Sequence, residues 1–408
     1  MQTSKQAALG FIFVTLLIDV MGWGLIIPVM ADLIAELKSI PVNIASTYGA
    51  LLLSAFAITQ FLFSPVIGNL SDQYGRRPVL LVSLLGFGID YIILAWAPTY
   101  GWLFVGRVIA GITGASFTTA SSYIADISSD ETARAKNFGL IGAAFGLGFV
   151  LGPALGGLLA TWGLRAPFYA AAVLCLLNFL FGYFILPESL EKHNRRAFDW
   201  KRANPLGSLR FLARHAEIGG LALSFFLIYL GAQAVQGSWN FFTIYRFDWS
   251  EGMIGVSLTV VGVLTGLVQA GLTRVLNPKI GNEKSIYLGL SMYALGLILF
   301  AFASEGWMMF VFLVPYCLGG ICGPSLQSVI AGQVSKNHQG ELQGALTSLM
   351  SLTTIIGPLL MNSTFSYFTT DSAPFHFPGM HFLIGAACML GGLLIVNRVM
   401  NKEKVNVI

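Results

Sequence analysis

The sequence predicts an all-α integral membrane protein, with 12 transmembrane helices in two parallel-repeat six-helix bundles. Composition, the spacing of apolar runs and an internal repeat predict this fold class. Of 408 residues, 55% are hydrophobic and 10% are charged, whereas a soluble domain carries about 25% charged residues. Together with a mean hydropathy of +0.74, this composition predicts that most of the chain lies within a lipid bilayer.

Twelve apolar runs of roughly 20–30 residues follow one another along the chain. This length suits helices that cross a hydrocarbon core about 30 Å thick. The first run is too long for the core of a signal peptide, so we expect it to be retained as a helix. The expected spans are 6–37, 46–73, 77–97, 100–127, 133–161, 165–186, 217–246, 250–276, 281–303, 306–334, 339–369 and 377–401.

One connection, residues 187–216, is long, polar and basic. It separates the spans six and six, so we expect an N-terminal bundle over 1–186, a cytoplasmic linker over 187–216 and a C-terminal bundle over 217–408. With the N-terminus in the cytoplasm, 19 of the 23 Lys and Arg residues lie in cytoplasmic segments. The positive-inside rule favours this orientation, in which both termini are cytoplasmic.

The two halves of the chain repeat each other at a near-constant offset. Parallel repeats related by an axis along the membrane normal are typical of transporters, with a substrate site near mid-membrane between the halves. The matched landmarks, 205 or 206 residues apart, are Gly75 with Gly281, Gly114 with Gly320, and Gly152-Pro153 with Gly357-Pro358.

A dense charge cluster, GNLSDQYGRRP at residues 68–78, joins the second and third spans and therefore lies at one membrane face. It contains Asp72, Arg76 and Arg77. We expect Arg76 to reach Asp126 at the cytoplasmic end of the fourth span. We expect Asp72 to lie near the start of the eleventh helix, where the partial positive charge favours an anion. The alternative is a solvated loop that only follows the positive-inside rule.

Three ionisable residues of the N-terminal half are predicted to lie inside spans: Asp19, Asp90 and Arg107. Each costs about 2.5–3.5 kcal/mol near the bilayer centre on translocon scales. Counting 1.5 Å per residue puts Asp90 and Arg107 at similar depth, so we expect them to pair. A pair that only fixes helix register is the alternative. Asp19 has no partner evident at its level, which suits a residue that binds substrate or carries a proton.

The C-terminal half has no equivalent acid inside a span and offers neutral polar groups instead. Gln233, Gln236 and Asn240 recur at three and four residues, so we expect them to share a helix face that lines a cavity. Hydrogen bonding between helices is the alternative. The other neutral candidates are Gln60 in the second span, Tyr293 in the ninth and Gln327 in the tenth.

Glycines recur every four residues in the fifth span, at Gly148, Gly152 and Gly156, with Pro153 among them. Small residues at this spacing let two helix backbones approach closely, and proline favours a bend. We expect a close, bendable contact between the two halves. Packing without a role in gating is the alternative.

The sequence contains no pattern typical of an enzyme. The five histidines lie in loops or at span ends, and no Ser/His/Asp grouping or phosphate-cradling loop is present. The four cysteines have no zinc-type spacing. We therefore expect no catalytic residue, metal or cofactor, and transport that uses an ion gradient or runs downhill. The expected partners are a small-molecule substrate, protons and the lipid bilayer, without nucleic acid, and the expected state is a monomer.

These motifs give the chain a resemblance to the major facilitator superfamily over essentially its full length. GNLSDQYGRRP resembles the loop motif between helices two and three of that family. RVIAGITGA (107–115) is similar to the fourth-helix motif of its drug/proton antiporters, with Ala110 where glutamine is usual. GFVLGPALGG (148–157) resembles the fifth-helix motif of exporters. Segments 16–29, 75–91, 121–128, 247–258 and 339–359 are similar to the tetracycline/proton antiporter subfamily.

The resemblance implies roles for the candidate residues. Asp19 and Asp90 match aspartates used for substrate–metal and proton handling, and Gln60, Arg107 and Gln233 match polar positions of the family. Contacts of the loop motif would latch the cytoplasmic side shut in the outward-open state. The residues assigned to conformational gating are Gly68, Asp72, Gly75, Arg76, Arg77, Asp126, Gly148, Gly152, Pro153 and Gly156.

The chain departs from the tetracycline branch in the C-terminal half. Tyr293 occupies the position of an aspartate of the ninth helix, and Thr265 that of a polar residue of the eighth. The resemblance therefore implies a proton-coupled exporter of another small organic or amphipathic compound in a bacterial inner membrane. Uptake or uniport of a metabolite on the same fold is one alternative. A non-transporting membrane receptor or lipid-interaction protein is the other.

Overall fold

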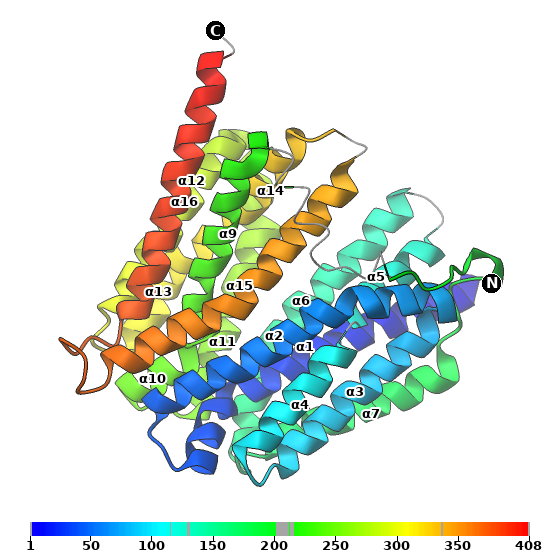
Figure 1. The fold of residues 1–408 in the computed structure, drawn as a ribbon, viewed down its shortest axis with the longest axis horizontal. Helices are drawn as coiled ribbons and strands as arrows, with labels where there is room; N and C mark the ends of the chain where they lie inside the picture. The colour runs from blue at the N-terminus through cyan, green and yellow to red at the C-terminus, as the bar shows by residue number, and fades with distance from the viewer. Residues whose placement is uncertain are drawn as a thin grey trace. The chain divides into compact units, whose positions relative to one another are not determined.

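The computed structural model describes residues 2–114, 116–128, 131–200, 212, 216–335 and 338–406, and these form helices joined by short turns (Figure 1). Within this part of the chain, 12 segments are long and apolar enough to cross a membrane, which confirms the predicted fold class. The elements are α1 (Gln2–Lys38), α2 (Val42–Tyr74), α3 (Arg76–Trp96), α4 (Tyr100–Thr113), α5 (Ser116–Ile127), α6 (Glu131–Ala160), α7 (Ala166–Ile185), η1 (Lys192–Asn194), α9 (Ala216–Gln236), α10 (Trp239–Phe247), α11 (Glu251–Gly266), η2 (Leu267–Leu272), α12 (Thr273–Ala301), α13 (Gly306–Leu318), η3 (Gly319–Ile321), α14 (Cys322–Gly332), α15 (Gln339–Phe368) and α16 (Met380–Asn406).

Three spans that the sequence predicts as continuous are interrupted, the fourth and the tenth of them near the middle. The fourth divides into α4 and α5 at Gly114, where ψ is 43°. The seventh divides into α9 and α10 at Gly237 and Ser238, and the tenth passes through the short 3-10 turn η3. Glycines lie at all three breaks, and breaks of this kind free backbone carbonyls that need other partners.

The internal repeat extends to backbone conformation. Gly75 (φ 108°) and Gly281 (φ 81°), 206 residues apart, both adopt the left-handed region. The turn at Gly281 lies within α12, so the eighth span continues through η2 into the first residues of α12. The break at Gly114 likewise has its counterpart in η3, which contains Gly320.

The chain forms two compact units, Met1–Ile40 with Ala55–Pro205 and Ser250–Gly262, and Pro41–Ser54 with Leu206–Trp249 and Val263–Ile408. In the second unit, the first turns of α2 attach to α15, where the Ser54 hydroxyl donates to the Ile355 carbonyl at 2.7 Å. In the first unit, the first turns of α11 attach to α6, where the Thr259 hydroxyl donates to the Val150 carbonyl at 3.3 Å. The two exchanged segments are equivalent parts of the repeat.

The boundaries expected for the two bundles, at 186/187 and 216/217, stay a prediction. Residues 201–211 and 213–215 of the expected linker lie outside the described residues. The described start of the linker passes through η1 and contacts the loop after α2, as shown below.

The glycine face of α6 packs against α1 of its own half, so the predicted contact between the halves is wrong for these three glycines. A Cβ at Gly152 would lie 2.8 Å from the carbonyl oxygen of Met21, and Gly148 and Gly156 approach α1 equally closely. Pro153 lies against Gly24 on the same face. The neighbouring Gly157 instead meets α11, where a Cβ would lie 2.8 Å from the Glu251 carbonyl oxygen.

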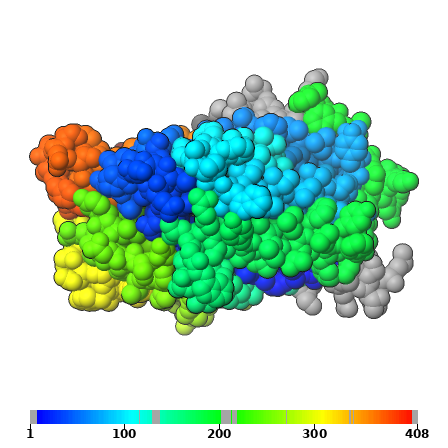
Figure 2. Space-filling model, turned by 90° about the horizontal axis from the view of Figure 1, so that it is seen from below, coloured from blue at the N-terminus to red at the C-terminus, as the bar shows by residue number. Residues whose placement is uncertain are grey.

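The outer surface carries apolar side chains, as expected in lipid. Residues of α7, green in Figure 2, form part of the face seen there. Because water would be excluded from a bilayer core, such exposed side chains suit contact with acyl chains. The exposed apolar residues of α7 include Tyr169, Val173, Leu177, Leu180, Phe181 and Phe184.

Candidate substrate and proton site

An ion pair between Asp90 on α3 and Arg107 on α4 lies inside the first unit, as the depth of the two residues predicts. Asp90 is fully buried and Arg107 is 6% exposed. The guanidinium lies 5.8 Å from the centre of the Tyr91 ring and 5.9 Å from that of Phe56. A Cβ at Gly106 would lie 2.6 Å from the Asp90 carboxylate, so glycine makes room for the pair.

Asp19 on α1 has a different environment. Both of its carboxylate oxygens are shielded from solvent and have no hydrogen-bond partner among the described residues. The hydroxyl of Ser116, the first residue of α5, lies near this carboxylate without forming a hydrogen bond to it. The sequence did not indicate Ser116, because the break that orients the start of α5 is not visible in a run of apolar residues.

Tyr91 lies between the ion pair and α1, and the sequence analysis missed it. Its ring contacts the Arg107 guanidinium, and a Cβ at Gly22 would lie 2.7 Å from its hydroxyl oxygen. Gly22 is three residues from Asp19, so the two share a face of α1. The buried aromatic ring therefore bridges the ion pair and the face of α1 that carries Asp19.

Gln60 satisfies the carbonyl freed by the break in the fourth span, where its amide donates to the Gly114 oxygen at 3.0 Å. Asn362 on α15 serves the break between α9 and α10 in the same way, donating to the Gly237 oxygen at 3.0 Å. The sequence analysis assigned Gln60 to the site and missed Asn362. In both units, a side-chain amide stabilises the interrupted helix.

The second unit gathers phenols where the first gathers charges. Tyr293 on α12 packs on Gly319, with its ring centre 5.1 Å from that of Tyr316. Tyr229 on α9 interacts with Gln327 on α14 and lies within electrostatic range of Tyr293. The structure thus brings together two predicted residues, Tyr293 and Gln327, and adds two phenols that were not assigned to the site.

The face expected from Gln233, Gln236 and Asn240 does not form, because α9 ends at Gln236 and a new helix begins at Trp239. Gln233 is buried and packs against Gly357 of α15. Gln236 is exposed. The Asn240 side chain accepts a hydrogen bond from the backbone of Phe241 at 3.0 Å. Helical periodicity cannot be counted across the break.

At the charged loop, Arg76 connects three carboxylate and hydroxyl groups. Its guanidinium lies 3.1 Å from Asp126 and 2.5 Å from Asp72, and it donates to the Ser71 hydroxyl at 2.7 Å. The expected Arg76–Asp126 contact is confirmed. The expected place of Asp72 near the eleventh helix stays a prediction, because α15 starts in the second unit.

Glu188, which the sequence analysis passed over, accepts hydrogen bonds from the backbone N–H groups of Arg76 at 2.8 Å and Arg77 at 3.3 Å. These are the first residues of α3, where an anion is favoured. The Arg77 side chain donates to the Tyr183 carbonyl at 2.6 Å, and the Arg196 N–H donates to the Asp72 carbonyl at 3.1 Å. The first residues after α7 are therefore fixed to the loop.

Comparison with known proteins now identifies the family. The profile of the Major Facilitator Superfamily matches residues 12–358 and 221–406. The chain belongs to the Major Facilitator Superfamily. The tetracycline resistance protein of class C from Escherichia coli is 43% identical over 94% of each chain. The class G protein from Vibrio anguillarum is 40% identical over 93% of this chain and 95% of that one.

Solved structures of two other transporters share the fold. The human organic anion transporter MFSD10 (TETRAN) has a TM-score of 0.72 at 24% identity, over 96% of this chain and 99% of that one. The nucleoside transporter NupG has a TM-score of 0.76 at 12% identity, over 97% of this chain and 99% of that one. This protein is therefore a membrane-embedded transporter of the superfamily, with a small-molecule substrate and relatives that are tetracycline resistance proteins.

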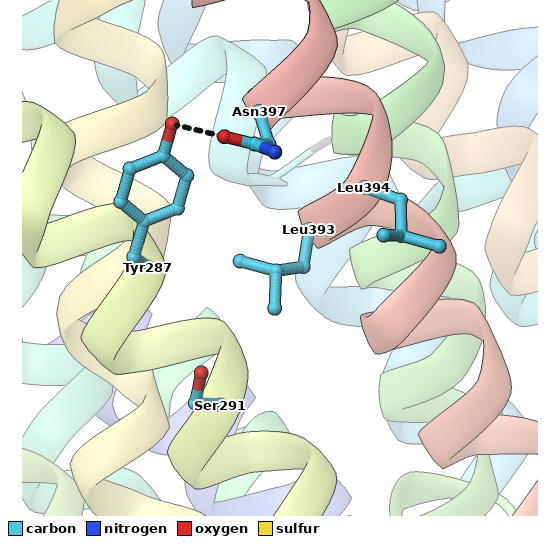
Figure 3. A pocket seen from close by; sticks show the side chains of 5 residues that line it. All are labelled: Tyr287, Ser291, Leu393, Leu394 and Asn397. Atoms are coloured by element: carbon cyan, nitrogen blue, oxygen red, sulfur yellow. Dashed lines mark hydrogen bonds between the residues drawn. The ribbon is translucent and has the colours of Figure 1, made fainter.

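A surface hollow of about 290 Å³ is lined by α12 and α16 and includes none of the buried charges or phenols described above (Figure 3). The Tyr287 hydroxyl donates to Asn397 at 3.4 Å across it. Leu393, Leu394 and Ser291 complete the lining. Because no carboxylate or cation lines this hollow, we take the buried charges of the first unit and, separately, the phenols of the second unit as the candidate functional groups.

Proposed function

We propose that the protein exports a small organic or amphipathic compound in exchange for protons, by alternating access. The buried, unpaired carboxylate of Asp19 beside the Asp90–Arg107 pair carries this proposal. A carboxylate without a counter-ion in a membrane protein core gains most by binding a proton or a cationic group. The names of the relatives, which are tetracycline resistance proteins, support drug export.

The N-terminal half handles protons and the C-terminal half recognises substrate in this proposal. Tyr229, Tyr293, Tyr316 and Gln327 offer aromatic faces with hydroxyl and amide groups. Such groups suit an amphipathic or aromatic molecule better than a metal chelate, which would require a carboxylate. The protein acts as a monomer in a cytoplasmic membrane, with both termini in the cytoplasm and no cofactor.

Exchange in proteoliposomes with an imposed proton gradient tests the proposal. Tetracycline with and without Mg²⁺ and a panel of amphipathic aromatic compounds are supplied, and proton release is followed with a pH-sensitive dye. Asp19→Asn and Asp90→Asn abolish substrate-dependent proton flux. Asp371→Asn, which neutralises an exposed loop carboxylate, leaves it intact. Wild-type flux in folded Asp19→Asn and Asp90→Asn proteins would contradict proton coupling through these residues.

Tyr293→Phe tests the assignment of substrate recognition to the C-terminal half. The phenyl ring keeps the packing on Gly319 and Tyr316, and only the hydroxyl is lost. A hydrogen bond to substrate is worth about 1–1.5 kcal/mol, so affinity falls by about tenfold. Substrate affinity is measured by the ligand-induced shift in melting temperature. Unchanged affinity with unchanged stability would remove Tyr293 from the substrate site.

A further inference from the structure

The Asp19 carboxylate belongs to a cluster of buried oxygen atoms drawn from three helices of the first unit. Thr15 is one turn before Asp19 on α1, and both lie on one face. The Asn178 amide on α7 donates to the Thr15 hydroxyl at 3.1 Å. One turn further along α7, a Cβ at Gly182 would lie 2.5 Å from the ring of Phe11, which is one turn before Thr15 on α1. The same face of α7 therefore follows the same face of α1 over two successive turns.

The start of α5 adds two hydroxyls to this cluster. Leu16 of α1 and Ala120 of α5 pack in one buried hydrophobic cluster, which brings the start of α5 next to Asp19. Ser116 and Thr119 lie on the same face of α5. Both are buried, with exposed fractions of 5% and 1%. Because the fourth and sixth spans run antiparallel to α1, Thr119 and Asn178 are displaced from Asp19 in the same direction, toward Thr15. The cluster has two layers, one helical turn apart.

Several oxygen atoms of this cluster are buried without a partner among the described residues: both carboxylate oxygens of Asp19, the Thr119 hydroxyl and the amide oxygen of Asn178. Asn178 is 3% exposed. A buried polar atom without a hydrogen-bond partner destabilises the folded state. Helix packing alone does not require unpartnered oxygen atoms on three adjacent helices. We therefore interpret these atoms as potential ligands of a cation.

The backbone next to the cluster favours a cation. α4 ends at Thr113, three residues before Ser116, and the C-terminal end of a helix carries a partial negative charge. The last carbonyls of a helix have no backbone partner within it, and the Gly114 oxygen at the end of α4 accepts a hydrogen bond from Gln60 of α2. In transporters, unwound backbone and half-helix C-terminal ends coordinate Na⁺ or H⁺ in this manner.

We propose that Asp19, Ser116, Thr119 and Asn178 form a binding site for a dehydrated sodium ion. One carboxylate with neutral hydroxyl and amide oxygens matches a single positive charge. Calcium and magnesium sites take more than one charged oxygen or retain waters. The described residues contain no group of three His, Cys, Asp or Glu that could hold a transition metal. This site deepens the proposed function, because Na⁺ would compete with the proton at Asp19.

Sodium-dependent stabilisation of the purified full-length protein tests the site. Unfolding is followed in detergent while NaCl replaces choline chloride at constant ionic strength. Binding to the folded state raises the melting temperature by about 2 °C at tenfold the dissociation constant, and KCl gives a smaller shift because K⁺ is larger. Identical melting temperatures in NaCl and choline chloride would overturn the site.

Thr119→Val separates a ligand from a structural role. Valine removes a hydroxyl that has no partner, so without sodium the variant is as stable as wild type or more stable. The sodium-dependent shift and the binding of radioactive Na⁺ are lost. Thr118→Val, the same change on the exposed side of α5, retains both. A full shift in Thr119→Val or in Asp19→Asn contradicts the proposal.

The proton-coupled function is tested separately, in vesicles that contain choline in place of sodium. Proton-driven substrate exchange there supports the proposed function whether or not sodium binds. Sodium binding without proton-driven exchange would contradict the proposed function and leave the sodium site standing. The two proposals can therefore fail independently.

Discussion

The two repeats share a backbone and differ in how they treat buried charge. Gly75 and Gly281 adopt the same left-handed turn, and the fourth and tenth spans break at equivalent positions. Yet the first unit buries Asp19, Asp90 and Arg107, whereas phenols occupy the second. Both repeats therefore share the backbone pattern, whereas the buried acidic and basic side chains named here occur in the first repeat.

The charged loop shows the same contrast. Arg76 joins Ser71, Asp72 and Asp126 in the first copy. The equivalent residue 206 positions later is Asn282, whose amide donates to the Ser328 hydroxyl at 3.2 Å. An ionic contact has been replaced by a neutral hydrogen bond at the same place in the fold. Any step of the transport cycle that depends on this charge is therefore controlled from one half.

Breaking the buried ion pair should have the largest effect on stability. Arg107→Gln leaves the Asp90 carboxylate buried without its counter-ion, which costs about 3–5 kcal/mol. The free energy of unfolding is measured by denaturant titration in detergent. The double variant Asp90→Asn with Arg107→Gln recovers part of the loss, because two neutral amides replace two charges.

The double variant also separates structure from function at this pair. Proton-coupled exchange remains lost in it even where stability returns, because Asp90 no longer titrates. Recovery of both stability and exchange would reduce the pair to a device that fixes helix register. No phenol pair in the second unit should show this behaviour, since Tyr293 and Tyr316 pack as neutral rings.

The two left-handed glycines offer a matched comparison of intermediate size. Alanine at either position is strained by about 1–2 kcal/mol, because φ is positive in both turns. At Gly75 the added methyl would also collide with the Glu188 carboxylate, whereas Gly281 faces open space. Gly75→Ala therefore destabilises more than Gly281→Ala in thermal unfolding. Equal losses would contradict the contact between Glu188 and the start of α3.

Hydropathy predicted the spans, the constant offset of glycine landmarks predicted the repeat, and the depth of two charges predicted the Asp90–Arg107 pair. Depth along a helix follows from counting residues, so two charges at one level can be matched before the structure is known. The interrupted helices could not be predicted, because glycine is frequent throughout the chain (46 residues), whereas only three of the expected spans break in the part of the chain that the structure describes.

Partners in tertiary packing were also beyond the sequence. The spacing of Gly148, Gly152 and Gly156 indicates a close helix neighbour and does not say which one, so the contact was expected between the two halves, whereas these glycines pack on α1 of their own half. Glu188 and Asn362 bind backbone groups that are exposed only where helices begin or break. Such roles depend on where a helix begins or ends, and no pattern of side chains in the sequence predicts them.

The smallest expected effects distinguish the two copies of the charged loop. Asn282→Ala removes one exposed hydrogen bond, so turnover changes by less than about twofold. Arg76→Gln removes a charge held by two carboxylates, and we expect turnover to fall by about tenfold while substrate affinity stays unchanged. Initial exchange rates at saturating substrate report turnover, and thermal-shift titration reports affinity. If both substitutions slow turnover equally, the two loops contribute equally, and the inference that one half controls the step is wrong. If Arg76→Gln weakens substrate affinity instead, the loop acts on the substrate site and has no role as a latch.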